Sequence, residues 1–194
     1  MRIGLLGGTF DPVHVGHVVG AVEARHALAL DTVLLVVANR PWQKEGDRPI
    51  TPAADRLAMV QAAVADVHGV EASALEIERG GPSYTADTVA ALAAGHPGAE
   101  LFLVVGADVA AALGTWVRGD ELHAAVTVAV LGRSGAPGGL PPAPWRSVAV
   151  AMPALEVSSR DIRARAAAGR PLDGLVPAGA LRELRRRGLY ARRR

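Results

Sequence analysis

The chain has 194 residues and a net charge of +2; half of the residues are hydrophobic, 21% are charged and none is cysteine. This length and composition predict a single folded domain, argue against disorder over most of the chain, and exclude disulfides, zinc–thiolate sites and thiol nucleophiles. No apolar stretch approaches the roughly 18 residues of a membrane-spanning helix, and the N-terminal apolar run is too short for a signal peptide, so we expect a cytoplasmic protein without a membrane partner.

Short apolar runs alternate with alanine-rich helical stretches along the chain. In chain order the expected strands are Arg2–Leu6, Val33–Val37, Leu101–Val105 and Val126–Leu131, with weaker candidates at Val70–Ile77 and Val148–Val150. The expected helices are Gly16–Leu28, Pro52–Val67, Thr85–Ala94, Val109–Leu113, Asp161–Ala168 and Ala178–Arg187. Because the strands are continuously apolar, both of their faces should be covered. The pattern predicts an α/β doubly wound, Rossmann-like parallel sheet with helices on both faces, in one domain (1–194) whose C-terminal part is helical from about residue 158.

Local signals refine the helix ends and the connections. Thr51 can cap a helix that begins with Pro52, where a missing N–H costs nothing, and Gly188 stands at an expected helix end. Two long segments, Asn39–Ile50 and Gly132–Pro144, lack periodicity and are expected to be loops. In this type of sheet, ligands bind at the carboxyl ends of the strands, so functional motifs should follow strands directly.

The first such motif is a glycine-rich segment between the first strand and the next helix. It reads Gly7-Gly8-Thr9-Phe10-Asp11-Pro12-Val13-His14-Val15-Gly16-His17. It is neither a Gly-x-Gly-x-x-Gly loop nor a Walker A loop, because no lysine follows the glycines. The glycines let the backbone approach a ligand, and the helix N-terminus attracts an anion. His14 and His17, one helical turn apart, could donate to phosphate oxygens; zinc is weakly supported without a third ligand, and packing histidines are the plainer alternative.

A second motif opens a helix near the C-terminus and reads Ser158-Ser159-Arg160-Asp161-Ile162-Arg163. Ser158 or Ser159 can cap the helix, whose N-terminus then attracts an anion. Arg163 lies one turn further on and can bind a phosphate through its forked guanidinium. Taken alone, the segment would be better explained as an ordinary serine cap followed by a surface arginine.

Two further segments follow expected strands or precede expected helices. The string Arg79-Gly80-Gly81-Pro82-Ser83-Tyr84-Thr85-Ala86-Asp87-Thr88 is a tight loop that turns into a helix, which Thr85 could cap with Asp87 in the first turn. Gly106-Ala107-Asp108 follows a strand, and Trp116 comes eight residues after Asp108. A core anchor is the commoner role of a tryptophan, so these residues alone leave the role of Trp116 open.

Together these segments resemble the nucleotidyltransferase superfamily, in which a (H/T)-x-G-H element binds ATP and a Ser-Ser-x-x-Ile-Arg element holds its β- and γ-phosphates. The full first motif and the Gly-Pro-x-Tyr-Thr-x-Asp-Thr string are similar to those of the bacterial nicotinate-nucleotide adenylyltransferases in particular. The resemblance extends from Arg2 to about Tyr190. It implies ATP and nicotinate mononucleotide as partners, deamido-NAD and pyrophosphate as products, and Mg²⁺ that arrives on ATP without a protein metal site.

The same resemblance implies roles for individual residues. His14, His17 and Arg163 would be catalytic. The ATP-binding residues would be Gly7, Gly8, Thr9, Phe10, Gly16, Gly106, Asp108, Ser158, Ser159 and Ile162. The mononucleotide-binding residues would be Asn39, Lys44, Tyr84, Thr85 and Trp116, with Trp116 stacked on the pyridine ring. Trp42 and Gln43 depart from the Pro-His-Lys ending usual in the family, and Arg133 is a further candidate for phosphate.

Other functions compete with this interpretation. A phosphopantetheine or other mononucleotide adenylyltransferase and a nicotinamide-preferring enzyme share the chemistry, and a non-catalytic nucleotide sensor could share the fold. A dinucleotide-dependent oxidoreductase fails on the missing Gly-x-Gly-x-x-Gly. The basic clusters Arg185–Arg187 and Arg192–Arg194 have almost no interleaved aromatic residues, so we expect no nucleic-acid partner. The sequence does not determine the oligomeric state, and a homo-oligomer is one of the alternatives.

Overall fold

The computed structural model describes residues 1–41, 49–132 and 139–191. Its centre is a six-stranded sheet in the order β3-β2-β1-β4-β5-β6, and all neighbouring strands are parallel. The strands are β1 (Arg2–Gly8), β2 (Thr32–Val37), β3 (Val70–Ser73), β4 (Glu100–Gly106), β5 (Val126–Gly132) and β6 (Ser147–Ala151). The winding reverses between β1 and β4, which confirms the doubly wound α/β fold expected from the sequence.

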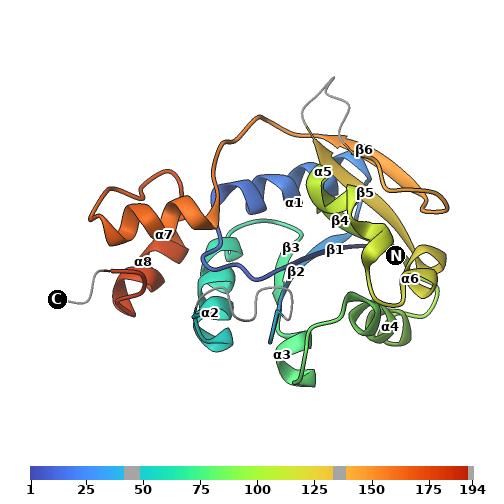
Figure 1. Cartoon of the computed structure of the whole chain (residues 1–194), viewed down its shortest axis with the longest axis horizontal. Coiled ribbons are helices and arrows are strands. Elements are labelled where there is room, and N and C mark those ends of the chain that lie inside the picture. Colours follow the sequence, from blue (N-terminus) through green and yellow to red (C-terminus); the bar gives the residue numbers. More distant parts are fainter. Residues whose placement is uncertain (42–48, 133–138, 192–194) are drawn as a thin grey trace.

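Helices cover both faces of this sheet, and Figure 1 shows α1 on one side of it and α4 on the other. The helices are α1 (Val15–Ala27), α2 (Ala53–Val64), α3 (Leu75–Arg79), α4 (Thr85–Gly95), α5 (Ala107–Ala111), α6 (Gly119–Ala125), α7 (Ser159–Ala167) and α8 (Ala178–Arg186), with a 3₁₀ turn η2 at Leu113–Thr115. Among the helices that the structure describes, none is long and apolar enough to cross a membrane.

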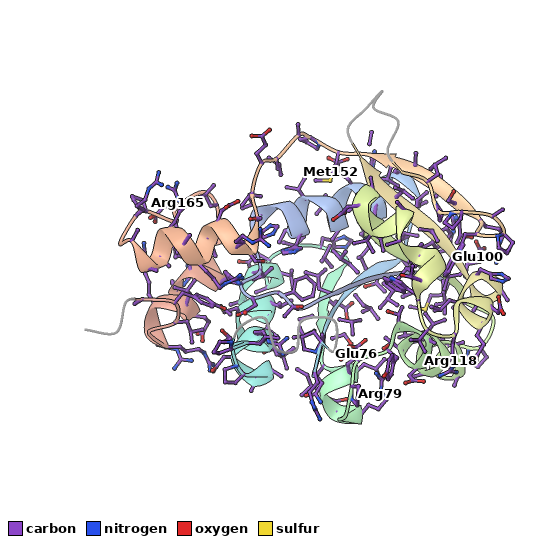
Figure 2. All side chains as sticks on the ribbon, viewed as in Figure 1. Glu76, Arg79, Glu100, Arg118, Met152 and Arg165 are labelled. Carbon is purple, nitrogen blue, oxygen red and sulfur yellow. The ribbon has the colours of Figure 1, made fainter. Side chains whose placement is uncertain are left out.

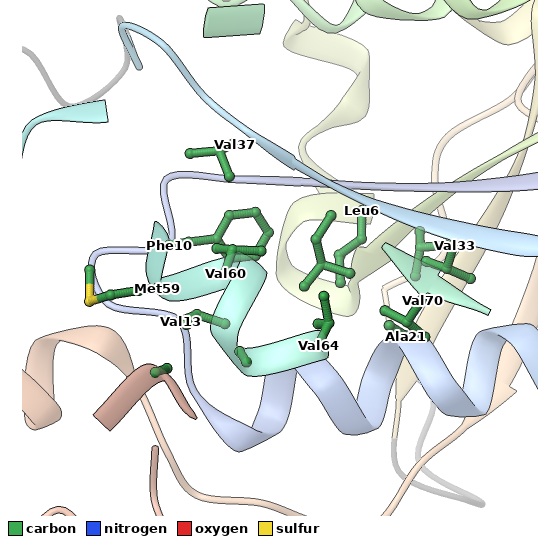
Figure 3. Packing of buried hydrophobic residues seen from close by; sticks show 14 of the residues in the cluster. Leu6, Phe10, Val13, Ala21, Val33, Val37, Met59, Val60, Val64 and Val70 are labelled. Atoms are coloured by element: carbon green, nitrogen blue, oxygen red, sulfur yellow. The ribbon is translucent and has the colours of Figure 1, made fainter. Parts of the chain in front are cut away.

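In the four inner strands, β1, β2, β4 and β5, residues of one strand enter two different hydrophobic clusters, which explains the continuous apolar runs. In β4, Phe102 and Val104 join the cluster that contains residues of α1 and α2, whereas Leu103 and Val105 join the cluster that contains residues of α4, α5 and α6. Figure 3 shows the first cluster, in which Met59 and Val60 of α2 lie near Phe10. Both faces of the central strands are therefore buried, as in other doubly wound sheets.

Two segments differ from the sequence-based expectation. The weak strand candidate Val70–Ile77 is a strand only to Ser73, because β3 ends there and the chain turns into α3; the Ser73 hydroxyl accepts a hydrogen bond from the Leu75 N–H (3.3 Å). Helix α6 was not predicted. It begins after Arg118, whose backbone is left-handed and whose guanidinium pairs with Asp87 and Glu121, and the bond to Asp87 is a long-range contact that local sequence does not reveal.

Two expected helix caps are also wrong. Thr51 does not cap α2: the N-cap is Pro52, and the Thr51 hydroxyl instead donates to the Tyr190 hydroxyl (3.2 Å). Thr85 is the first helical residue of α4, and Tyr84 occupies the N-cap position. At α2, the tertiary contact with Tyr190 thus overrides the local preference for a threonine cap.

Helix α8 packs directly on α2, and Figure 1 shows α7 and α8 beside α2 at one end of the molecule. The two helices approach so closely at Gly179 that a Cβ atom there would lie 2.0 Å from the Ala62 carbonyl oxygen. Next to this contact, the Arg187 guanidinium pairs with Asp55 of α2 and with Glu183 (2.9 Å). The C-terminal helices are thus anchored on the helix that follows β2.

We expect Gly179→Ala to lower the free energy of unfolding by about 1–3 kcal/mol, because the methyl group must push the two backbones apart. Urea denaturation would measure the change. Gly95→Ala is the matched control: Gly95 is also helical, and no described atom lies within 4 Å of its Cβ position. There we expect no loss and up to about 1 kcal/mol of stabilisation. Equal stability of the two variants would contradict the close packing.

Candidate active site

A cleft of about 400 Å³ opens at the carboxyl ends of β1 and β4, where the winding of the sheet reverses. Such a switch point is where doubly wound folds bind ligands. Eight of the residues expected from the sequence to bind substrate line this cleft, namely Gly7, Gly8, Thr9, His17, Tyr84, Thr85, Gly106 and Trp116. The structure therefore brings the loop after β1, the start of α4 and the segment after β4 to one cavity.

The two histidines of the first motif form a stacked pair at the start of α1. Their ring centroids lie 3.6 Å apart, and His14 is the N-cap residue of the helix. The His14 backbone N–H donates to Nδ1 of His17 (3.1 Å). Since Nδ1 accepts this bond, the proton of a neutral His17 ring is on Nε2. His17 can therefore offer an N–H donor in the cleft that it lines.

The glycines of the motif make room for this pair. A Cβ atom at Gly16 would lie 3.1 Å from His14 Nδ1, and one at Gly8 would lie 2.9 Å from the Phe10 ring. The Phe10 ring is buried and meets His17 edge-on, with the centroids 4.9 Å apart. Phe10 itself has a left-handed backbone (φ 49°), a conformation that costs a non-glycine residue about 1–3 kcal/mol. The loop that leads to His17 thus contains a strained residue, Phe10.

Burial keeps His14 neutral. Its side chain is 9% exposed, and desolvation lowers its pKa from 6.5 to about 4. Among the residues that the structure describes, none hydrogen-bonds Nδ1 of His14, so no acceptor stabilises an added proton there. At neutral pH the stacked pair therefore avoids placing a charge on its more buried ring.

The second motif is joined to the first by hydrogen bonds. Ser158 caps α7, accepting from the Asp161 N–H (3.1 Å). The Ser159 hydroxyl donates to the Pro12 carbonyl (2.8 Å), and Nη1 of Arg163 donates to the Asp11 carbonyl (2.6 Å). Segments that are about 150 residues apart in sequence thus meet at the loop that carries the histidines. Two motifs that bind the phosphates of one ligand must lie close together, and these two do.

Two of the residues expected to bind ATP are oriented differently from that expectation. Ile162 is fully buried in the core cluster, and its backbone N–H donates to the Ser158 carbonyl (3.0 Å). Its side chain therefore anchors α7 and does not face the cleft. Phe10 is likewise 2% exposed and belongs to the core, so its ring packs against His17 and is not among the described residues that line the cleft.

The part of the cleft that holds the residues expected to bind a mononucleotide is built by two loops that hydrogen-bond each other. The Asn39 N–H donates to the Ser83 hydroxyl and the Asn39 side-chain amide donates to the Gly81 carbonyl, both at 2.9 Å. The Ser83 N–H donates in turn to the Arg40 carbonyl (3.0 Å). These bonds place Tyr84, at the start of α4, beside the end of β2. Lys44, Trp42, Gln43 and Arg133 lie outside the described residues.

The remaining residues that the sequence predicts to bind substrate lie in or next to the opposite wall of the cleft. Trp116 lines the cleft and is half-buried just after η2. Gly106 also lines it, and a Cβ atom there would lie 2.8 Å from the Asp108 carboxylate. Asp108 itself is exposed in the first turn of α5, next to the cleft-lining residues Gly106 and Val109.

A buried acid in the cleft was not anticipated from the sequence. Glu76 of α3 is 6% exposed, lines the cleft and accepts a hydrogen bond from the Thr88 hydroxyl (2.6 Å). Arg79 donates to the same hydroxyl (3.2 Å), and Figure 2 labels both Glu76 and Arg79 on α3. This network ties the first turn of α4, and with it Tyr84, to α3. The sequence analysis placed Glu76 in a weak strand candidate, and no local pattern marked it as a residue of the cleft.

Two more polar contacts escaped the sequence analysis. Arg56 is 1% exposed and donates to backbone carbonyls near the cleft. The Tyr190 hydroxyl donates to the buried Asp11 carboxylate (2.6 Å). Burial, together with the hydrogen bond to Asp11, raises the pKa of Tyr190 above its usual range. The hydroxyl therefore stays protonated, and the C-terminal segment is fastened to the histidine loop.

The donors in and beside the cleft are of a kind that binds phosphate: His17 lines the cleft, and Arg163, which is not among the described lining residues, bonds the loop that carries His17. Imidazole and guanidinium N–H groups donate to phosphate oxygens, whereas Mg²⁺ prefers carboxylate and carbonyl oxygens. Among the described residues there is no group of three or more histidine, aspartate or glutamate side chains that could hold a metal ion.

The pKa of His14 generates a testable pH dependence. Because the pKa is 6.5 when unfolded and about 4 in the folded protein, the unfolded state binds a proton first as the pH falls below 6.5. His14 should therefore cost the protein about 2–3 kcal/mol of stability between about pH 7 and about pH 4.5. Urea denaturation of the wild type and of His14→Gln at both pH values would measure it. An equal pH dependence in the two proteins would contradict a buried neutral His14.

Comparisons with known proteins agree with this architecture. A family model described as cytidylyltransferase-like matches residues 5–165. A protein of Corynebacterium kroppenstedtii is 41% identical over 192 residues, covering 97% of this chain and 90% of its own. A protein of Exiguobacterium sibiricum is 42% identical over 191 residues, covering 98% of this chain and 100% of its own. Both relatives are named probable nicotinate-nucleotide adenylyltransferase.

A solved structure is similar as well. It is the Plasmodium falciparum nicotinic acid mononucleotide adenylyltransferase complexed with NaAD, with a TM-score of 0.76, 16% identity and 97% coverage of both chains. At this identity the likeness shows the fold alone. The family model and the full-length relatives go further: the chain belongs to the nicotinate-nucleotide adenylyltransferase family, within the cytidylyltransferase-like group.

Proposed function

We propose that this protein transfers the AMP moiety of ATP to nicotinate mononucleotide, which gives deamido-NAD and pyrophosphate. The observation that carries the proposal is the junction of the two motifs: Ser159 and Arg163 hydrogen-bond the loop from which His14 and His17 extend. The names of the full-length relatives support the choice of substrates. The expected cytoplasmic location and the oligomeric state stay predictions.

On the ATP side, the loop from Gly7 to Phe10 and the N-terminus of α1 receive the triphosphate, since free N–H groups at a helix start attract anions. His17 donates from Nε2 to the phosphate region where the leaving oxygen develops charge, and His14 supports it as the stacked partner. Arg163, with Ser158 and Ser159 at the start of α7, holds the distal phosphates. Asp108 accepts from the adenosine hydroxyls near Gly106.

The reaction itself is an in-line attack by a 5′-phosphate oxygen of the mononucleotide on the α-phosphorus of ATP. The new O–P bond forms as the bond to the pyrophosphate oxygen breaks. The attacking phosphate is mostly ionised at neutral pH, because its second pKa is near 6, so no general base is needed. Catalysis then consists of placing two anions in contact and stabilising the charge on the leaving group. Imidazole N–H groups and permanently charged guanidinium groups are donors that suit that task.

On the mononucleotide side, Trp116 stacks on the pyridine ring and backbone amides near Tyr84 and Thr85 bind the nicotinate carboxylate. Asn39 holds the loop before them through its bonds to Gly81 and Ser83. Lys44, outside the described residues, is assigned to the mononucleotide phosphate. Mg²⁺ bound to ATP supplies charge neutralisation on phosphate oxygens, with few or no protein ligands.

The central test is a substrate comparison. Purified protein is incubated with ATP, Mg²⁺ and one of three acceptors, nicotinate mononucleotide, nicotinamide mononucleotide or phosphopantetheine, and pyrophosphate release is followed. We expect the highest kcat/KM with nicotinate mononucleotide and the adenylylated dinucleotide as the second product. Faster turnover of either other acceptor would refute the assigned substrate, and no turnover with any of them would favour the nucleotide sensor.

A second test addresses the histidine pair. We expect His17→Ala to lower kcat by at least about 100-fold, because it removes a donor to the developing charge. Its far-UV circular dichroism should match the wild type. His26→Ala is the control, since His26 is exposed at the other end of the same helix and should leave kcat unchanged. Near-normal kcat in His17→Ala would count heavily against the proposed role.

A further inference from the structure

Arg56 of α2 connects three backbone segments around the cleft. It is 1% exposed, and among the described residues it is the largest side chain that is fully buried. Nη1 donates to the Thr9 carbonyl (2.8 Å), Nη2 to the Asn39 carbonyl (3.1 Å) and Nε to the Thr51 carbonyl (2.8 Å). All three nitrogen atoms of one planar group are thus bonded to main-chain oxygens.

These three segments carry different parts of the site. Thr9 belongs to the loop that precedes the histidines and lines the cleft. Asn39 is bonded to Gly81 and Ser83, and so fixes the loop that leads to Tyr84. Thr51 is the residue before the N-cap of α2 and donates to Tyr190, which binds Asp11. The Arg56 side chain therefore hydrogen-bonds both the ATP loop, at Thr9, and the mononucleotide loop, at Asn39.

The chemistry of arginine suits a spacer of this kind. A guanidinium is rigid and planar, so carbonyls bound to its different nitrogens are held at fixed separations. Burying a charged group is costly, and a hydrophobic residue of similar volume is often at least as good for stability. Arg56 positions three carbonyls, two of them from segments beside the cleft. This buried cation therefore has a role beyond packing.

We propose that Arg56 is a positioning residue that sets the distance and orientation of the two half-sites, and through them of the two reacting phosphates. The inference rests on the proposed adenylyl transfer. Arg56 itself does not line the cleft, so it acts through the carbonyls of Thr9 and Asn39. Because a misplacement of about 1 Å can cost roughly 100-fold in rate, a loosened spacer should affect turnover much more than binding of either substrate alone.

The test compares Arg56→Lys with Arg165→Lys. Lysine keeps the charge but cannot present the fixed fork that meets three separate carbonyls. Arg165 is a matched control because its guanidinium also donates to a backbone carbonyl, that of Pro171, from Nε (3.1 Å) and Nη2 (2.9 Å). It lies on α7 toward the end of the molecule that holds α7 and α8 (Figure 2). For each folded protein, kcat and both KM values are measured, and calorimetry gives the Kd of ATP and of nicotinate mononucleotide separately.

We expect Arg56→Lys to lower kcat by at least about 10-fold while each Kd stays within about threefold of the wild type, and Arg165→Lys to change neither. If Arg56→Lys does not fold, Arg56→Gln is measured in the same way. Unchanged kcat in a folded Arg56 variant, or a loss of affinity as large as the loss of kcat, would overturn the positioning role. Failure of both variants to fold would also overturn it, since stability would then be the role of Arg56. The wild-type rate tests the proposed function separately, because it depends on no Arg56 variant.

Discussion

The carbonyl oxygens of the loop after β1 are held by side chains from distant elements, and the site depends on these bonds. Arg56 binds the Thr9 carbonyl, Arg163 binds that of Asp11, and Ser159 binds that of Pro12. Buried carbonyls need such partners, because an unpaired one costs about as much as a lost hydrogen bond. The donors also offset carbonyl dipoles that would repel a bound phosphate. The loop can therefore keep a strained turn at Phe10 and still present His17.

The same bonds make the C-terminal part of the chain a component of the site. The cytidylyltransferase-like match ends at residue 165, yet Tyr190 reaches the Asp11 carboxylate and Thr51 donates to Tyr190. Helix α8 holds this segment in place by packing on α2 at Gly179. Arg56 also projects from α2, so one helix both anchors the C-terminal segment and spaces the two half-sites. A change that loosens the α2–α8 contact should therefore also change the geometry of the cleft.

The site combines imidazole hydrogen-bond donors with guanidinium donors that carry a permanent charge. His14 is buried and neutral at physiological pH, so the stacked imidazoles do not repel each other as two cations would. Permanent positive charge comes instead from guanidinium groups, whose protonation does not change near neutral pH. Glu76, a buried carboxylate in the other half of the cleft, is engaged by the Thr88 hydroxyl.

By itself, the sequence determined the order of the strands along the chain, the doubly wound class and the two motifs that meet at the histidine loop, because continuous apolar runs and strand-to-helix turns are local patterns. Helix α6 and the cap of α2 were decided by tertiary contacts, those of Arg118 and Thr51. Arg56, Glu76 and Tyr190 could not be assigned from local pattern either. Asp11 and Tyr190 are 179 residues apart, and a buried polar residue is recognisable only when the fold has brought its partner to it.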